Sequence, residues 1–372
     1  IQEVERRADW KEKRRRKLDR GRGGQTVTVA HETTSSVPWY ARYVVRDGEM
    51  LNDVIGDILG LLPANGGQIV FAEGTYLYDG DIVIDRDNVV IKGQGEGTRF
   101  VLKAGTNKDV KGIYANGRTG LEIADFAMDG QKDQQSENYK HDGVTFTGCQ
   151  HSKIEGLKVH YYLDRGIRLE GCEEIEVLSN TLNDNNFNLY GNECKNLTVT
   201  SNNARWSRAN GMYFQNVIQS VISGNLCNEA IYRGVGNNVI TGIVLAAGCN
   251  SNAITDNICN ENYGFGLSVY GANHTISGNQ CNGNWYGGIS LISTERCIVS
   301  NNTCCDNKGD HYDGIEIQGP AKDCVLQNNT CTGNSRYGIY IGSGATGHFI
   351  SNNDCQNNEV GGIGDQGTNT RT

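Results

Sequence analysis

The stretch from Cys281 to Cys304 reads CNGNWYGGISLISTERCIVSNNTC, and it decides the fold. It contains a glycine followed by an apolar residue, Gly288-Ile289, and then a short apolar run, 297–300, that ends in paired asparagines. A pattern of this kind that recurs at a fixed interval marks a repeat architecture. The glycine–apolar step recurs at Gly143-Val144, Gly166-Ile167, Gly211-Met212, Gly242-Ile243, Gly266-Leu267, Gly288-Ile289, Gly314-Ile315, Gly338-Ile339 and Gly362-Ile363.

The intervals between these steps are nearly regular. Most are 22 to 26 residues, one is 31, and one of 45 is a double step whose middle is Asn188-Leu189. Each repeat predicts two or three short strands separated by polar turns. Such strands bury no face alone, but coils stacked about 4.8 Å apart place each residue over its counterpart in the next coil. Asn then stacks on Asn, and the amide side chains can hydrogen-bond along the stack.

The composition agrees with a solenoid. The 372 residues include 49 Gly and only 3 Pro, and the hydrophobic fraction is 37%. A solenoid needs less apolar sequence than a globule of this length, because its core is one thin column closed by backbone hydrogen bonds. We therefore predict an all-β, right-handed parallel β-helix of about 10–12 coils, with an N-terminal capping helix and a charged N-terminal arm.

The thirteen cysteines follow the repeat instead of forming pairs. Unpaired Cys behaves as a small hydrophobe, so two cysteine series predict buried stacks inside the coils. Free thiols favour folding in a reducing cytoplasm. Zinc-type CxxC spacing is missing, so we expect neither a metal nor another cofactor. The series are Cys227, Cys259, Cys281, Cys304, Cys331 and Cys355, and Cys149, Cys172, Cys194, Cys249, Cys297 and Cys324.

The chain divides into three predicted parts: a basic helical arm or linker at 1–30, a connection with a capping helix at 31–65, and the parallel β-helix at 66–372. Apolar residues at helical spacing place the capping helix at 51–62. Residues 1–23 hold ten Lys/Arg and five Asp/Glu. That run could touch nucleic acid or anionic lipid, but a solvated arm leading to an upstream attachment explains it better, so we expect no nucleic acid partner. No stretch of 18 apolar residues exists, so we expect no membrane span.

The first coils carry a family resemblance. Residues 66–76 combine Gly66-Gly67, an apolar run and Gly74-Thr75-Tyr76, and residues 87–95 end an apolar run in Gly-Gln-Gly. This pattern resembles the pectate-lyase superfamily of right-handed β-helices over about residues 45 to 365, with repeats like those of tail spikes and mannuronan epimerases. The resemblance implies the fold and a glycan-binding groove, whereas members of this fold differ widely in function.

The repeat register gathers charged residues in the N-terminal half. Equal offsets from the glycine lie above one another, so His141 lies over Asp164, Asp142 lies over Arg165, and Lys140 leads through Asn185 to Arg208. Acids with cationic neighbours could catalyse acid/base chemistry at a glycosidic bond or beside a uronate. The alternative is a surface charge ladder without chemistry. The candidate catalytic residues are Lys140, His141, Asp142, Asp164 and Arg208, and the candidate substrate-binding residues beside them are Arg165, Arg168, Glu170 and Tyr213.

One more specific resemblance is incomplete. Met128-Asp-Gly130 and Lys140-His-Asp142-Gly143 are similar to the groove of mannuronan C5-epimerases. Those enzymes continue with Asp-Pro-His-Glu one coil later, where this chain has Ile167-Arg168-Leu169-Glu170. The signatures of polygalacturonase-like hydrolases and the acidic calcium cluster of pectate lyases are also missing. The resemblance therefore implies a glycan groove without a known active site.

A second strip lies further along the chain. Exposed aromatic residues at coil spacing suit the apolar faces of sugar rings, while Asp and Arg can fix hydroxyls or carboxylates. The alternative is that the aromatics only cover the backbone of the turns. The strip comprises Tyr263, Trp285, Tyr286, His311, Tyr312, Asp313, Arg336 and Tyr337, with Glu316 and Tyr340 on the neighbouring strand.

These features predict a polysaccharide-recognising β-helix of a virion or cell-surface spike, with or without depolymerase activity. Its expected partners are an extracellular polysaccharide and either two further copies in a homotrimer or a larger assembly held through the N-terminal arm. A secreted polysaccharide lyase, hydrolase or C5-epimerase is the first alternative, and a purely structural solenoid is the second. An exposed glycan-binding surface implies a location on a virion or outside the cell.

Overall fold

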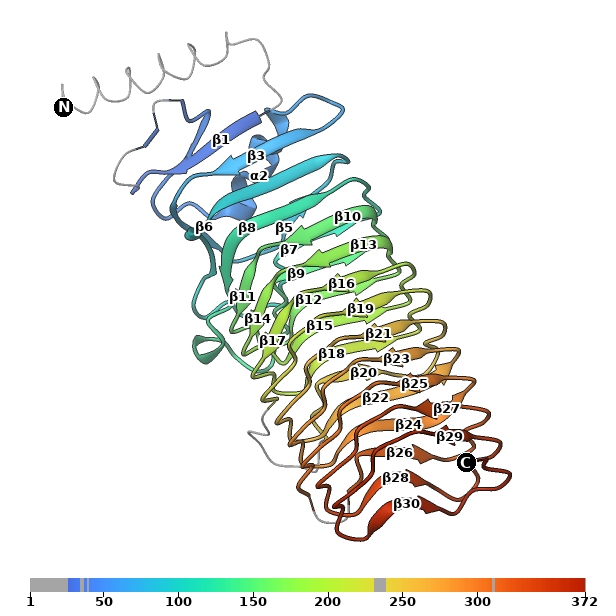
Figure 1. Ribbon diagram of the computed structural model, residues 1–372. Coiled ribbons are helices and arrows are strands. Elements are labelled where there is room, and N and C mark those ends of the chain that lie inside the picture. The colour runs from blue at the N-terminus through green and yellow to red at the C-terminus, as the bar shows by residue number, and fades with distance from the viewer. Residues whose placement is uncertain (1–25, 34–36, 39, 231–238, 310–311, 372) are drawn as a thin grey trace, which may run out of the picture.

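The computed structural model describes residues 26–33, 37–38, 40–230, 239–309 and 312–371. Most of the predicted arm at 1–30, and His311 of the second strip, therefore lie outside the described residues. The described chain is an elongated stack of parallel strands that runs from β1 near one end to β30 at the other (Figure 1).

One face of the stack is a sheet of twelve strands, and each strand pairs in parallel with the strand of the next coil. Twelve strands mark about twelve coils among the described residues, which confirms the predicted parallel β-helix. The strands are β5 (Ile82–Ile84), β7 (Ile113–Asn116), β9 (Val144–Thr147), β12 (Arg165–Glu170), β15 (Phe187–Asn192), β18 (Asn210–Gln215), β20 (Ile243–Leu245), β22 (Phe265–Ala272), β24 (Gly287–Glu295), β26 (Ile315–Gln318), β28 (Tyr337–Ile341) and β30 (Gly361–Asp365).

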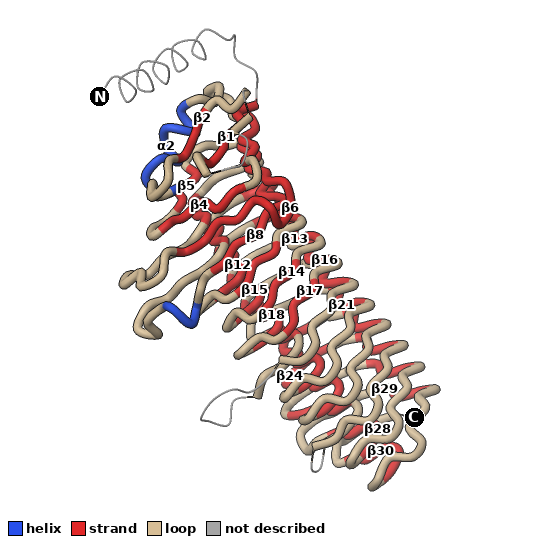
Figure 2. Tube along the Cα trace, turned by 90° about the vertical axis from the view of Figure 1, so that its left-hand side faces the viewer, coloured by secondary structure: helices blue, strands red, loops and turns tan. Residues whose placement is uncertain are grey.

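The remaining strands form a second, 18-stranded parallel sheet that bends around the rest of each coil (Figures 1 and 2). The long strands β6 and β8 each continue through both of the sides of the coil that this bent sheet covers. Its strands are β1 (Thr26–His31), β2 (Tyr43–Val45), β3 (Gly67–Phe71), β4 (Gly74–Tyr78), β6 (Val89–Leu102), β8 (Glu122–Asp129), β10 (Gln150–Glu155), β11 (Lys158–His160), β13 (Glu173–Leu178), β14 (Thr181–Asn183), β16 (Thr198–Thr200), β17 (Asn203–Arg205), β19 (Val221–Ser223), β21 (Ala253–Thr255), β23 (Thr275–Ser277), β25 (Ile298–Ser300), β27 (Val325–Gln327) and β29 (Phe349–Ser351).

Close stacking of the coils explains the glycine of each repeat. The residue after the glycine pairs with its counterpart as predicted, for example Ile315 with Ile339. A Cβ atom at Gly314 would lie 2.6 Å from the carbonyl oxygen of Gly338, well inside van der Waals contact. A side chain at this position would therefore push adjacent coils apart. Close packing of the coils thus explains why this position is glycine.

Asparagine and cysteine stack inside the coils as the repeat predicts. The Asn225 side chain donates to Oδ1 of Asn257 at 2.9 Å, and the backbone N–H of Asn225 donates to the same oxygen at 3.0 Å. All thirteen cysteines are unpaired, and all but Cys305 and Cys355 are buried. Cys227 and Cys259 occupy adjacent coils, since the Cys227 N–H donates to the carbonyl of Ile258 at 2.8 Å.

The N-terminal end contains the predicted helix. Helix α2 (Leu51–Gly60) buries Leu51, Val54, Ile55, Ile58 and Leu59 in the core, while its role as a cap stays a prediction. A short 3-10 helix, η1 (Lys132–Gln134), lies in the loop before β9. Strand β1 (Thr26–His31) already pairs with β3, so the sheet contains residues upstream of the predicted boundary at 66. In the described part of the chain, no helix has both the length and the apolar character needed to cross a membrane.

Candidate functional site

The outer face of the 12-stranded sheet carries one continuous column of side chains. Each member is the second residue after the glycine step, or after the equivalent position in coils without that glycine, and pairs with the same position in the next coil. We call these residues the outer column. They are Val83, Tyr114, Thr145, Arg168, Tyr190, Tyr213, Val244, Ser268, Ser290, Glu316, Tyr340 and Gly364.

At the N-terminal end of this column five charged residues meet, and we call them the first cluster: Asp142, Asp164, Arg165, Arg168 and Glu170. The Arg165 guanidinium lies 2.5 Å from Oδ2 of Asp164 and 3.9 Å from Oδ1 of Asp142. The Arg168 guanidinium lies 2.5 Å from Oε1 of Glu170 and 3.4 Å from Oδ2 of Asp142. Two arginines thus interlink three carboxylates from neighbouring coils, as the register of the sequence predicts for Asp142 and Arg165.

Asp142 has the most unusual environment of these residues. Its side chain is buried, and Oδ1 accepts the backbone N–H of Arg165 at 3.0 Å. Burial, helped by the negative charge of Asp164, raises the pKa of Asp142 to about 6, although Arg165 and Arg168 act to lower it. A carboxyl group whose pKa lies near neutrality can exchange a proton at physiological pH, which is what a general acid or base requires.

Aromatic rings continue the first cluster toward the middle of the column. The Arg165 guanidinium lies 4.4 Å from the ring centre of Tyr190, and Tyr190 stacks on Tyr213 at 5.6 Å with the rings 5° apart. Phe187 lies beside both tyrosines. Tyr213 was among the residues predicted from the sequence, whereas Tyr190 and Phe187 were not. The signal was present, because the double step centred on Asn188-Leu189 places Tyr190 between Arg168 and Tyr213.

The structure does not bring three of the candidate catalytic residues to this cluster. His141 lies over Asp164, but its ring is buried and contacts the carbonyl of Lys108 at 3.1 Å, and burial lowers its pKa. Arg208 does lie over Asn185 as the register predicts, since the Arg208 N–H donates to the Asn185 carbonyl at 3.1 Å, but the Asn185 side chain is buried and donates to the Val159 carbonyl at 3.1 Å. Lys140 is exposed, and within the described residues we find no side-chain contact from it or from Arg208 to the first cluster.

A second cluster lies near the C-terminal end of the column and comprises Asp313, Glu316, Arg336, Tyr337 and Tyr340. The Arg336 guanidinium pairs with both carboxylate oxygens of Asp313. It lies 4.0 Å from the ring centre of Tyr340, which stacks on Tyr337 at 5.7 Å. Glu316 is buried and accepts the Ser290 hydroxyl at 2.7 Å. Burial raises the pKa of Asp313 and of Glu316.

The two clusters share one arrangement. In each, an aspartate before the glycine step accepts the backbone N–H of the next coil at 3.0 Å: Arg165 for Asp142 and Tyr337 for Asp313. In each, an arginine from that next coil lies over a tyrosine of the outer column. The clusters are seven coils apart, from β9 to β26, which corresponds to about 34 Å along the stack.

Between the clusters, the loops that lead into the 12-stranded sheet present aromatic rings. Trp285 is 52% exposed and stacks on Tyr263 at 6.2 Å with the rings 8° apart. Tyr286 contacts Tyr312 at 4.7 Å. We call this surface, from the first cluster along the outer column and these rings to the second cluster, the groove strip. It contains the predicted aromatic residues apart from His311, which lies outside the described residues.

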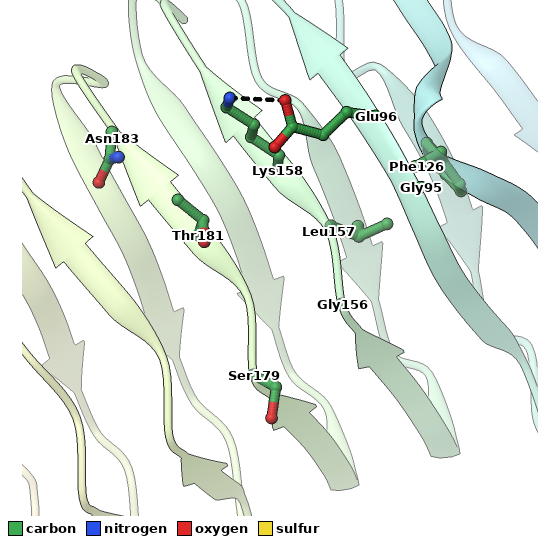
Figure 3. A pocket seen from close by; sticks show the side chains of 9 residues that line it. All are labelled: Gly95, Glu96, Phe126, Gly156, Leu157, Lys158, Ser179, Thr181 and Asn183. Carbon is green, nitrogen blue, oxygen red and sulfur yellow. Dashed lines mark hydrogen bonds and ion pairs between the residues drawn. The ribbon is translucent and has the colours of Figure 1, made fainter.

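A separate hollow of about 280 Å³ lies on the 18-stranded sheet (Figure 3). It forms where β6 shifts its register against β8, and Glu96 reaches Lys158 across it at 2.9 Å. None of the predicted site residues lines it. The lining residues are Gly95, Glu96, Phe126, Gly156, Leu157, Lys158, Ser179, Thr181 and Asn183.

Comparisons with known proteins agree with the fold. The family model described as "Right handed beta helix region" matches residues 142–304 and 234–371. A search of curated proteins finds no match. This chain is similar to the solved structure of the Dettilon tailspike protein, gp208, with a TM-score of 0.69 and 15% identity over 91% of this chain and 68% of the tailspike.

Two further solved structures have the same fold. The A-module of the Azotobacter vinelandii mannuronan C-5 epimerase AlgE6 matches with a TM-score of 0.63 and 18% identity, over 86% of this chain and 94% of the module. ORF18 of Geobacillus virus E2 matches with a TM-score of 0.59 and 14% identity, over 81% of this chain and 58% of that protein. At these identities the likeness shows the fold alone.

Proposed function

This chain belongs to the right-handed β-helix family, and we propose that it binds an extended polysaccharide along the groove strip. The observation that carries this proposal is the continuous run of aromatic rings and paired charges along one face of the rod. Aromatic rings stack on the apolar faces of sugars, and fixed carboxylates and guanidinium groups bind hydroxyls in defined directions. The structural neighbours include a tailspike and a module of a mannuronan epimerase, which is consistent with a polysaccharide ligand.

A glycan array with the intact chain, followed by titration of any hit, tests this proposal. We expect Trp285→Ala and Tyr190→Ala each to weaken binding about tenfold, which is about 1.4 kcal/mol, because each removes a ring from the strip. Phe349→Ala is the matched control, since Phe349 is also exposed but lies on the 18-stranded sheet. Full affinity in both strip variants, or equal losses in all three, would show that the glycan binds elsewhere.

We also propose that the chain acts as the glycan-recognising part of a spike on a virion or cell surface. The parallel with the tailspike supports this choice, as does the basic sequence at residues 13–17, which would link the rod to a larger assembly. A homotrimer is part of the proposal by analogy. A solution mass of three chains is the expected result, and a mass of one chain at micromolar concentration contradicts it. The thirteen unpaired cysteines are consistent with folding in a reducing cytoplasm before release.

A second candidate function, cleavage of the bound glycan, is favoured by one observation. Asp142 has a pKa of about 6 and lies beside a second carboxylate, Asp164, whose charge contributes to that shift. Two carboxyl groups in different environments can divide the roles of general acid and base at a glycosidic bond. Incubating a glycan hit with the chain should release reducing ends, and both Asp142→Asn and Asp164→Asn should abolish that release. Undiminished release by both variants would exclude these residues.

A further inference from the structure

We propose that the polysaccharide bound by the groove strip is uncharged, with no carboxylate or other acidic group. This inference rests on the proposed function and specifies its substrate class. It comes from the charges of the strip, which differ from those that a polyanion requires.

Among the described residues, the middle of the outer column carries no charged side chain. From Tyr190 to Ser290, the outer column contains only tyrosine, valine and serine, and its members are Tyr190, Tyr213, Val244, Ser268 and Ser290. The next outward positions of the same strands are also uncharged: Asn192 pairs with Gln215, and Tyr270 pairs with Ile292. Ser268 and Ser290 are buried, so the tyrosine rings and the amides are the groups that remain for a ligand, and they offer stacking and neutral hydrogen bonds, which suit hydroxylated sugars.

The arginines at the two ends are already paired with carboxylates of the protein. Arg168 binds Glu170 through Nε at 2.8 Å, and Arg165 binds Asp164. Arg336 holds Asp313 through two hydrogen bonds. Each cluster contains one more carboxyl group than arginine. A uronate that approached a guanidinium here would have to displace the carboxylate that is already bound to it. The new ion pair would replace the one that was lost, so the exchange would bring little net gain in affinity.

The charge of the whole rod opposes a polyanion as well. Residues 1–23 account for ten of the 34 Lys/Arg and five of the 43 Asp/Glu, so residues 24–372 hold 24 basic and 38 acidic residues, a net charge of −14. A field of this sign repels an approaching polyanion and lowers its rate of association.

β-Elimination and C5 epimerisation both begin with removal of the proton next to a carboxylate. An uncharged glycan therefore leaves hydrolysis as the cleavage reaction for the second candidate function.

The test compares each polysaccharide that binds on the array with its C6-oxidised derivative, in which primary alcohols have become carboxylates on the same backbone. We expect the neutral polymers to bind and their oxidised forms to bind at least tenfold more weakly. Binding of the neutral form should change less than about twofold between 0.05 and 0.3 M NaCl, because no ion pairs form with it. Equal or tighter binding of the oxidised forms, or hits confined to polyuronates and weakened by salt, overturns the inference. Failure of every polysaccharide to bind rejects the proposed function itself.

A gain-of-binding variant tests the cause. Glu170→Gln keeps the shape of the side chain but removes the charge that Arg168 pairs with, so it should raise affinity for the oxidised polymers at least threefold. Glu176→Gln is the matched control, because Glu176 is an exposed glutamate on β13 of the other sheet. The same increase in both variants would reflect net charge alone, and no increase in either would show that the paired arginines do not set the selectivity. Either result contradicts the mechanism.

Discussion

Burial of Asp142 should make the stability of the chain depend on pH. Its pKa rises from 3.8 to about 6 in the folded protein, so the protonated form is the one that folding favours. The stabilising contribution is fully present below pH 3.8 and is lost as the pH rises through about 6. The shift corresponds to about 3 kcal/mol. Asp142→Asn has no such titration, so its stability relative to the wild type should improve by most of that amount between pH 4 and pH 7.5.

Urea unfolding of both proteins at a series of pH values measures this difference. Asp142 is the suitable position because its carboxylate is buried, and Glu176→Gln, which changes an exposed carboxylate, is the control variant. A difference between wild type and Asp142→Asn that stays constant from pH 4 to pH 7.5 would mean that Asp142 has an ordinary pKa.

At the scale of single residues, the repeat register predicted which backbone positions stack but not where every side chain points. It placed Asp142 over Arg165 correctly, since the Arg165 N–H donates to Oδ1 of Asp142. It placed His141 over Asp164 correctly too, yet the His141 ring turns to the Lys108 carbonyl of the preceding coil. Side-chain direction in a turn depends on local hydrogen bonds, and equal offsets along the sequence carry no information about those.

At the scale of one coil, the buried asparagine stack is an element whose loss should be costly. Asn257 accepts two hydrogen bonds from Asn225, donates to the Ile222 carbonyl at 2.9 Å, and donates to Oδ1 of Asn279 at 3.0 Å. Asn257→Ala leaves the buried Asn225 N–H without its acceptor, so we expect a loss of about 3 kcal/mol in the free energy of unfolding. Asn116→Ala is the control because Asn116 is exposed on β7, and chemical denaturation of both should separate them clearly. Equal stability of the two variants would show that the stack contributes nothing.

Some strands of each coil could be predicted from the sequence more readily than others. The glycine step located the 12-stranded sheet because close packing forces glycine there in most coils. The apolar runs before paired asparagines located β25, β27 and β29 in the same way. The short third strand was harder to predict, since β11, β14 and β17 give way to single bridges such as Leu226–Ile258 in later coils. Bridges of one residue carry no alternating pattern that a sequence could reveal.

At the scale of the whole molecule, the spacing of the two clusters sets an expected ligand length. They lie seven coils apart, or about 34 Å, with aromatic rings between them. A glycan that reaches both should gain affinity from each end without paying twice for association, because its second contact is intramolecular. We therefore expect Kd to fall with oligosaccharide length until the chain spans that distance and then to level off.

Calorimetric titration with a size series of a bound glycan measures this dependence, and two variants separate the ends. Tyr190→Ala should weaken long oligosaccharides and Tyr340→Ala should do the same, because a spanning chain uses both clusters. A short oligosaccharide can bind at either cluster alone, and each variant weakens binding only at the cluster that it changes. Binding at the other cluster persists, so the measured loss of affinity is smaller. Because the register keeps both clusters on one face of a single stack, the distance between them is fixed by the number of coils. A disaccharide that binds as tightly as the longest member of the series would therefore mean that one local site, not the length of the rod, holds the ligand.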